Sequence, residues 1–321
     1  MPVTITAGIT FSGGGLTMAF APPQNTAGWF GGGYLSPTYS RTSTVQRITY
    51  ATDTAIASVR GPLSGNKDSV TASSNYNYGW FAGGAFPGGS LSVVDRITFV
   101  TDTETASVRG PLSAGTFQMA AAGNTTNGWF GGGFSGGTVS TVQLITYATD
   151  TATASVRGPL SMARRLFAAA GDSDYGWFGG GYVPSTSPAV RSTVDRITYA
   201  NDTATASVRG PLSLARQRLM AAGNTTDGWF GGGQGDSGNV SRVDRITYAN
   251  DTVTASVRGP LSSARYFGAA TSNETDAWFG GGNGPTSIVN RITFATDTAT
   301  ASVRGPLSAD SSRMAAAGGI Q

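Results

Sequence analysis

One feature constrains the fold of this chain more than any other, a sequence unit that recurs about every 50 residues. In every unit a tryptophan is followed by phenylalanine and by a glycine-rich run. Successive tryptophans are 51, 49, 48, 52 and 49 residues apart, at Trp29, Trp80, Trp129, Trp177, Trp229 and Trp278. A fixed period of this kind is typical of folds that repeat one supersecondary unit. We therefore interpret residues 1–321 as a single repeat domain.

Each unit contains four segments with strand character. In the unit of Trp129 they are residues 119–122 (strand A), 128–130 (strand B), 142–147 (strand C) and 151–156 (strand D). Short β-branched and aromatic segments between turn residues predict strands. Four antiparallel strands in a unit of this length predict a propeller blade rather than a solenoid turn. The small residues of strand A suit a crowded axis, and the Trp and Phe of strand B are expected to pack against different neighbouring blades.

The two ends of the chain carry further strand-like segments. Residues 14–19 look like a worn copy of residues 158–163, which would make residues 3–6 and 9–12 strands C and D of a further blade, and residues 313–319 are a seventh copy of strand A. Unpaired strand edges are a liability, and joining the two ends in one composite blade would remove them. We therefore predict seven blades, with residues 1–16 and 309–321 closing the ring; six blades are the alternative.

The composition argues against most catalytic chemistry. The chain has no cysteine and no histidine, which excludes thiolate sites and removes the usual general base at neutral pH. The repeated Thr-Asp-Thr turns fit turn stabilisation better than calcium binding, because isolated aspartates do not supply a converging set of oxygens. We predict a protein that is not an enzyme and binds no metal or cofactor. A propeller hydrolase that uses aspartates is the rival class, but the loop acids are scattered along the chain.

Charge and hydropathy limit the partners and the location. The formal net charge of +3 rests on arginine, with Lys67 as the single lysine, so a lysine-rich segment for nucleic acid is absent. The N-terminal residues have neither a basic segment nor an apolar segment of a signal peptide, and no apolar run is long enough to span a bilayer. We therefore expect no specific nucleic-acid binding, no signal peptide and no membrane insertion.

The order of motifs within the unit resembles the Kelch repeat. The residues concerned are Ala163-Arg164, WFGGG at 177–181 and VDRITY at 194–199. The resemblance implies four-stranded blades, although the tryptophan usual in the fourth strand is replaced by small residues at 206–208. The wording TVDRITYANDTATASVRGPLS at 193–213 is similar to repeats of virion structural proteins of cyanobacterial tailed phages. This second resemblance implies a virion protein that is synthesised in the host cytoplasm.

The two faces of such a fold can be separated by sequence, because antiparallel strands place the A–B and C–D connections on one face. The C–D turns hardly vary, whereas the B–C loops vary in length and content. Loops carry recognition, so we expect binding on the face of the B–C and D–A connections. The candidate residues are the aromatics Tyr34, Phe86, Phe134 and Tyr182 and the arginines Arg164, Arg165, Arg191, Arg216, Arg218, Arg242 and Arg265. Alternatively, the aromatics cap the blade core, and Arg164, Arg216 and Arg265 support strand A from the Kelch arginine position.

A second set of arginines follows strand D. Each of these arginines is as far after the aspartate of the C–D turn as a residue of strand C is before it. In a hairpin these two residues are cross-strand neighbours, within one position. We therefore predict structural pairs of Asp95 with Arg109, Asp195 with Arg209, and Asp244 with Arg258.

The composition predicts a non-enzymatic protein, and the resemblance in repeat wording implies a virion structural protein of a tailed phage. The expected role is a tail, fibre or surface module that binds host cell-surface polysaccharide or another virion protein through the variable loops. The alternatives are a capsid decoration protein and a non-viral Kelch-like scaffold for protein interactions. A homo-oligomer is compatible with the sequence but is not required by it.

Overall fold

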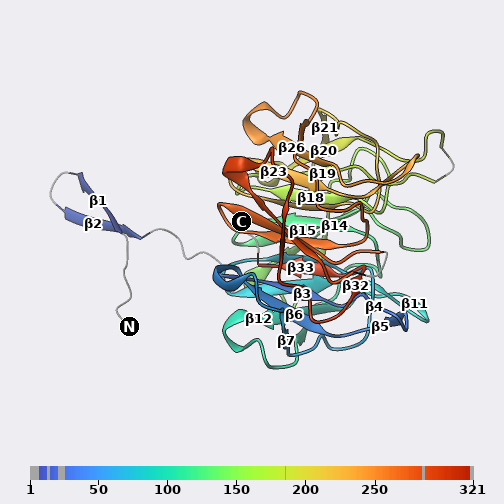
Figure 1. Cartoon of the computed structure of the whole chain (residues 1–321), viewed down its shortest axis with the longest axis horizontal. Coiled ribbons are helices and arrows are strands. Elements are labelled where there is room, and N and C mark those ends of the chain that lie inside the picture. Colours follow the sequence, from blue (N-terminus) through green and yellow to red (C-terminus); the bar gives the residue numbers. More distant parts are fainter. Residues whose placement is uncertain (1–6, 13–14, 21–25, 185, 284–285, 319–321) are drawn as a thin grey trace.

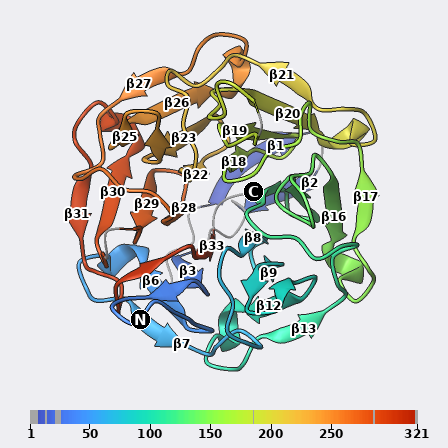
Figure 2. The same cartoon turned by 90° about the vertical axis from the view of Figure 1, so that its right-hand side faces the viewer.

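The computed structural model describes residues 7–12, 15–20, 26–184, 186–283 and 286–318, and the chain is all-β (Figure 1). The described residues form six antiparallel four-stranded sheets, named here sheets I to VI in chain order. Figure 2 shows the six sheets set around a central axis, with one strand of each sheet nearest the axis. The predicted repeat of four-stranded antiparallel units is confirmed, and the arrangement is compatible with a β-propeller.

Sheets II to VI each take their four strands from consecutive residues, in the order A, B, C, D. Sheet II contains β8 (Thr71–Ser74), β9 (Tyr78–Ala82), β12 (Val94–Thr98) and β13 (Ser107–Arg109). Sheet III contains β14 (Ala120–Gly123), β15 (Asn127–Gly131), β16 (Val142–Thr146) and β17 (Ser155–Arg157). Sheet IV contains β18 (Ala168–Gly171), β19 (Tyr175–Gly179), β20 (Val194–Thr198) and β21 (Ser207–Arg209). Sheet V contains β22 (Met220–Gly223), β23 (Asp227–Gly231), β26 (Val243–Thr247) and β27 (Ser256–Arg258). Sheet VI contains β28 (Ala269–Ser272), β29 (Asp276–Gly280), β30 (Val289–Thr293) and β31 (Ser302–Arg304).

Sheet I is composite. Its strands are β33 (Ala315–Ala317), β3 (Ala27–Gly31), β6 (Val45–Thr49) and β7 (Ser58–Arg60). The pairing of Trp29 with Ala317 joins the two ends of the repeat region. The C-terminal strand therefore pairs with the first tryptophan unit, and the prediction that residues 1–16 join residues 309–321 in one sheet is wrong for the residues that the structure describes.

The expected seventh sheet is not formed among the described residues. β1 (Ala7–Ser12) and β2 (Gly15–Phe20) instead pair with each other as a two-stranded hairpin. The predicted strand at residues 3–6 lies outside the described residues. With β33 already placed in sheet I, no strand A remains for a further sheet among the described residues.

The C–D connection is a short 3-10 helix, which shortens both predicted strands. Strand C of sheet III ends at Thr146, and strand D begins only at Ser155. The six helices are η1 (Tyr50–Thr52), η2 (Phe99–Thr101), η3 (Tyr147–Thr149), η4 (Tyr199–Asn201), η5 (Tyr248–Asn250) and η6 (Phe294–Thr296).

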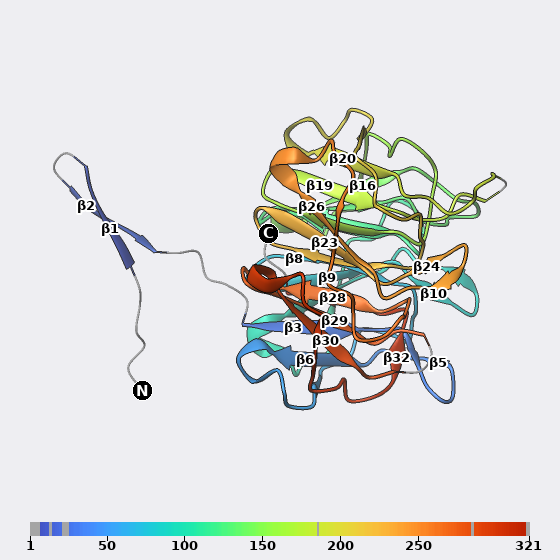
Figure 3. The ribbon, with the colours of Figure 1, turned by 45° about the horizontal axis from the view of Figure 1, so that its top comes forward.

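The B–C and D–A connections lie together on one side of the molecule, named here the variable face. Figures 1 and 3 show its short strands on the side opposite the β1–β2 hairpin. These strands are β4 (Tyr34–Leu35), β5 (Ser40–Arg41), β10 (Ala85–Phe86), β11 (Gly89–Ser90), β24 (Gln234–Gly235), β25 (Gly238–Asn239) and β32 (Ser311–Ser312). The opposite side carries the A–B and C–D connections and is named the uniform face.

The hydrophobic core is divided into six clusters, one at each junction between neighbouring sheets. At the junction of sheets III and IV, Trp129 and Phe178 belong to one cluster with Tyr199. The equivalent tryptophan of one sheet and phenylalanine of the next share each of the other clusters. The prediction that these two aromatics pack against different neighbouring sheets is confirmed. The core is therefore the set of contacts that holds the sheets to one another.

The glycine run after each tryptophan has a steric cause. A side chain at Gly179 would meet the Phe230 ring of the next sheet at 2.9 Å. Gly180 and Gly181 have φ values of +77° and +113°, which L-residues rarely adopt. The run therefore allows close sheet packing and a sharp exit from strand B.

A polar clasp joins neighbouring sheets on the uniform face. The indole N–H of each tryptophan donates to the aspartate in the C–D turn of the next sheet, and its ring stacks on the 3-10 helix aromatic there at 3.8–4.0 Å. The pairs are Trp29 to Asp102, Trp80 to Asp150, Trp129 to Asp202, Trp177 to Asp251, Trp229 to Asp297 and Trp278 to Asp53, at 2.8–2.9 Å. The last pair returns to the first sheet, so the clasps form a closed circle.

The arginines after strand D belong to these clasps, which corrects the predicted structural pairs. Arg209 lies opposite Val194, and Asp195 lies opposite Val208. A one-residue shift of register moves a side chain to the other face of a sheet, so Asp195 and Arg209 cannot meet. Arg109, Arg209 and Arg258 instead contact Asp150, Asp251 and Asp297 of the next sheet at 3.6, 3.5 and 3.3 Å. Their predicted partners Asp95, Asp195 and Asp244 pair with Lys67, Arg164 and Arg216.

In the part of the chain that the structure describes, no helix is long and apolar enough to cross a membrane.

Candidate binding site at the mouth of the axial channel

A narrow channel runs along the axis between the six sheets. It is lined by the middle residues of the six strands A, which are Ala72, Ala121, Ala169, Ala221, Ala270 and Ala316. At the variable face the lining changes to larger and more diverse side chains. We name this end of the channel the mouth.

The mouth is built by a closed circle of backbone hydrogen bonds. In each sheet, the residue two positions before strand A donates its N–H to the carbonyl of the equivalent residue in a neighbouring sheet, at 2.6–3.1 Å. Ser69 donates to Arg313, Arg313 to Phe267, Phe267 to Arg218, Arg218 to Leu166, Leu166 to Gln118, and Gln118 to Ser69. The backbone alone therefore closes the mouth, whatever the side chains are.

All six of these mouth residues adopt the left-handed backbone conformation, with φ between 54° and 63°. This conformation costs an L-residue on the order of 1 kcal/mol, and Gly, Asn or Asp normally occupy it. None of the six is Gly, Asn or Asp, and their side chains are hydroxyl, amide, aliphatic, aromatic and cationic. A strained backbone that carries six varied side chains around one opening is typical of a site where the side chains bind a ligand.

Three arginines at the mouth are stacked on aromatic rings. Arg313 lies 4.7 Å from the Phe267 ring centre, and Arg218 lies 4.8 Å from the same ring. Arg165, from the adjacent D–A connection, lies 5.2 Å from Phe134 and 5.6 Å from Tyr182. Stacking through the face of a guanidinium leaves its N–H edge available for a carboxylate or phosphate.

The positive charge at the mouth is only partly neutralised. Asp68 is bound tightly by Arg41 at 2.6 Å, and Arg313 approaches it only to 3.9 Å. Among the described residues neither Arg165 nor Arg218 forms a salt bridge, and Arg218 donates to the neutral Gln234 amide oxygen at 2.7 Å. Burial lowers the pKa of Arg218, and the charges of Arg313 and Arg165 lower it further. An anion between these arginines would relieve both effects.

Of the arginines predicted to bind, three are structural. The side chains of Arg164, Arg216 and Arg265 are buried, with relative exposures of 0%, 0% and 1%. Each donates a hydrogen bond to the backbone carbonyl of the strand B phenylalanine of its own sheet, at 2.8–2.9 Å. Burial lowers the pKa of Arg164 and of Arg216, while Asp195 and Asp244 oppose this effect. These three residues hold strand A to its own sheet, as in the alternative interpretation.

The other predicted residues lie on the variable face but do not all gather at the mouth. Arg191 donates to Thr186 at 2.9 Å, and Arg242 donates to Ser213 at 2.9 Å. Phe86 is 41% exposed in the β10–β11 hairpin, where Gly88 packs under its ring. Tyr34 contacts Arg41 and Arg313, which connects it to the mouth.

The structure adds residues that the sequence interpretation missed. Ser69, Gln118, Leu166, Phe267 and Arg313 lie in a unit-to-unit alignment at the position of Arg218. The one signal in the sequence was that the residue at this position differs from unit to unit, although strand A, which begins two residues later, hardly varies. A positive φ at this position cannot be predicted from the sequence, because none of the residues there is glycine.

Among the residues that the structure describes, no group of three or more acidic side chains is arranged to hold a metal ion. No protein-family model matches the chain, and no curated protein matches it.

Proposed function

We propose that this chain is a six-bladed β-propeller that works as a non-enzymatic binding module for an acidic ligand. The ligand class is an acidic polysaccharide of a cell surface, engaged at the mouth on the variable face. The observation that carries the proposal is the set of Arg165, Arg218 and Arg313, stacked on aromatic rings around an opening with little acidic compensation. Such a surface attracts polyanions and binds carboxylates through planar N–H edges.

The repeat wording supports a narrower proposal, that the module belongs to the virion of a tailed phage. There it would contact host polysaccharide or another virion protein, from a tail or fibre. Mass spectrometry of particles made with the encoding genome, followed by antibody labelling in electron micrographs, tests this. Label on the tail is the expected result. Label on the capsid would favour the decoration alternative, and absence from the particles would contradict a virion role.

The binding proposal is tested with two matched double variants. Arg165→Ser with Arg218→Ser removes two charges at the mouth, whereas Arg191→Ser with Arg242→Ser removes two charges elsewhere on the same face. The probe is polygalacturonate immobilised for interferometry, with neutral dextran as the comparison. We expect saturable binding of the parent to polygalacturonate only, at least a tenfold loss in the mouth variant, and less than a twofold loss in the control.

Thermal unfolding verifies that both double variants remain folded. Equal losses in the two variants would mean that diffuse charge attracts the polymer, and the mouth would not be the site. No binding of the parent would contradict the proposal for uronate polymers.

A further inference from the structure

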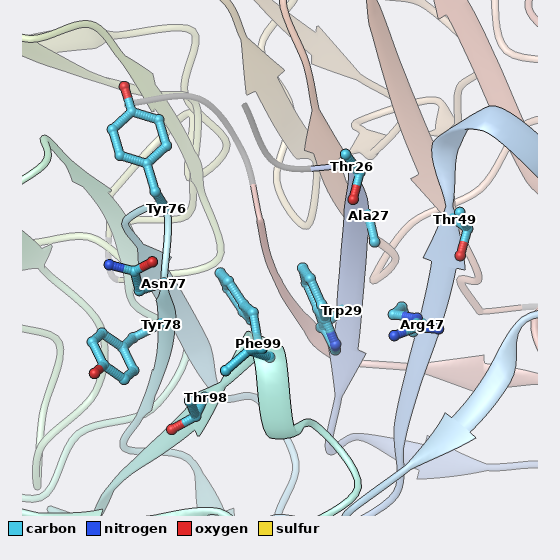
Figure 4. Close-up of a pocket in the computed structure, with 11 residues that line it drawn as sticks. Thr26, Ala27, Trp29, Arg47, Thr49, Tyr76, Asn77, Tyr78, Thr98 and Phe99 are labelled. Atoms are coloured by element: carbon cyan, nitrogen blue, oxygen red, sulfur yellow. The ribbon is translucent and has the colours of Figure 1, made fainter. Parts of the chain in front are cut away.

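The uniform face departs from its sixfold repeat at the junction of sheets I and II. A cavity of about 450 Å³ opens there, within the usual range for small-molecule sites. Figure 4 shows Arg47, Ala27 and Trp29 from sheet I and Tyr78 and Phe99 from sheet II around it. This cavity lies on the face opposite the mouth, because its residues lie in the A–B and C–D connections and in the parts of strands B and C next to them.

The cavity exists because one residue is small. The first residue of strand B is Tyr78, Asn127, Tyr175, Asp227 or Asp276 in sheets II to VI, but Ala27 in sheet I. Tyr78 and Tyr175 each cover the strand C arginine of their own sheet at 4.4 Å. Asp227 and Asp276 reach the equivalent arginines at 3.5 Å. Ala27 is too short to cover Arg47, which lines the cavity while its Nη1 donates to Asp102 at 3.0 Å.

Three further exceptions to the repeat lie at the same junction. Tyr76 stands in an A–B turn where the other turns have Thr125, Ser173, Thr225 and Glu274. Val100 is 89% exposed at the cavity rim, where the other units carry alanine. Phe99 replaces the tyrosine found in four of the six units. Tyr76 and Val100 add aromatic and apolar surface at this junction, and exposed apolar surface marks binding sites.

The chemistry of the lining selects a ligand class. Arg47 excludes cationic ligands, although aromatic walls otherwise suit them. Trp29 and Phe99 are already stacked on each other at 3.9 Å, so no slot remains between two ring faces for a flat base. The cavity instead offers aromatic walls from Tyr76 and Tyr78 together with hydroxyl, amide and guanidinium groups from Thr49, Thr98, Asn77 and Arg47. A ring with apolar C–H surfaces and hydroxyl edges matches this combination.

We propose that the cavity between sheets I and II binds a single hexose-sized sugar residue, as a second site independent of the mouth. This site does not depend on the acidic ligand of the variable face. The site would let one module hold a neutral sugar on one face while the other face contacts a polyanion.

The decisive variant fills the cavity with a side chain that the fold already accommodates. Ala27→Tyr is expected to place its ring over Arg47 as Tyr78 lies over Arg96. Asn127→Tyr is the matched control, because it makes the same residue at the equivalent position of sheet III. The probes are glucose, galactose, mannose and N-acetylglucosamine, with adenosine monophosphate as the planar anionic comparison, measured by saturation-transfer NMR and calorimetry.

We expect the parent and Asn127→Tyr to bind at least one of the sugars, and Ala27→Tyr to bind it at least tenfold more weakly with unchanged thermal stability. Arg165→Ser with Arg218→Ser is expected to leave sugar binding unchanged, which separates this site from the mouth. Undiminished binding by Ala27→Tyr would overturn the assignment of the cavity. Absence of sugar binding in the parent, or binding of the nucleotide alone, would overturn the ligand class. If Ala27→Tyr does not fold, Tyr76→Ala provides the test, and unchanged binding by that variant would also contradict the proposal.

Discussion

The clasps of the uniform face and the mouth of the variable face both repeat one backbone arrangement six times around the axis. The two regions differ in how much their side chains vary from unit to unit. At the clasps the same Trp and Asp recur in every unit, because the side chains themselves join the sheets. At the mouth the backbone joins the sheets, and the six side chains differ. Side-chain constancy therefore follows the groups that hold the ring together, and side-chain variety marks where the ring is free to bind.

The largest test of this difference removes one clasp aspartate. In Asp251→Ala, the buried Trp177 indole N–H loses its acceptor, and Arg196 and Arg209 lose their carboxylate. Leaving buried donors and charges unpaired costs several kcal/mol, and partial exposure of the arginines reduces this. We expect the free energy of unfolding to fall by about 3 kcal/mol, measured by urea denaturation.

The chain contains its own control for that variant. Sheet III carries Leu144 where the other sheets have a strand C arginine, so Asp202 pairs with Arg157 alone. Asp202→Ala is therefore expected to cost clearly less than Asp251→Ala. Equal losses would show that the arginines contribute nothing and that the indole hydrogen bond alone stabilises the clasp.

A second prediction concerns the aromatics that stack on the clasp tryptophans. Burial raises the pKa of Tyr147 above its usual value, although the hydrogen bond with Ser73 opposes this. A raised pKa in the folded state means that the stabilisation is complete below the unfolded value near 10 and is lost as pH rises beyond it. We expect Tyr147→Phe to lose less stability than the parent above this pH, by up to about 1.4 kcal/mol per pH unit. Denaturation series from pH 8 to 11 check this, and parallel curves would contradict it.

A third prediction lies in the layer between the two regions, where buried arginines support strand A. Arg164 and Arg216 contact Asp195 and Asp244 at 3.2 Å, but the equivalent of these acids near Arg265 is Asn290. Burial lowers the pKa of Arg265 to about 10. Asn290→Asp supplies the missing carboxylate and is expected to raise both this pKa and the free energy of unfolding, the latter by about 1 kcal/mol. A destabilised variant would mean that desolvation of the new carboxylate exceeds its attraction to Arg265.

The repeat made the strands, the sheets and the aromatic core predictable, because Trp, Phe and the glycine run report burial directly. The way in which the two ends of the repeat region join was predictable only in part. The seventh copy of strand A was visible at residues 313–319, but its partner depends on which strand edge is open. The Asp195 and Arg209 pairing failed because the 3-10 helix Tyr199–Asn201 shifts the register by one residue. At the mouth, Arg218 was found through its charge, whereas Ser69 and Leu166 carry no chemical signal outside the circle that they form.

The smallest expected effect on stability is also the sharpest test of the mouth. If Arg218 is kept in a left-handed conformation for binding, Arg218→Gly should relieve strain while the unfolded chain gains freedom. These effects nearly cancel, so we expect the free energy of unfolding to change by less than about 1 kcal/mol. Binding to polygalacturonate should nevertheless fall at least threefold. Arg191→Gly, outside the circle, is the control and should leave binding intact. A strongly destabilised Arg218→Gly that still binds would mean that the Arg218 side chain, like the clasp residues, serves the fold.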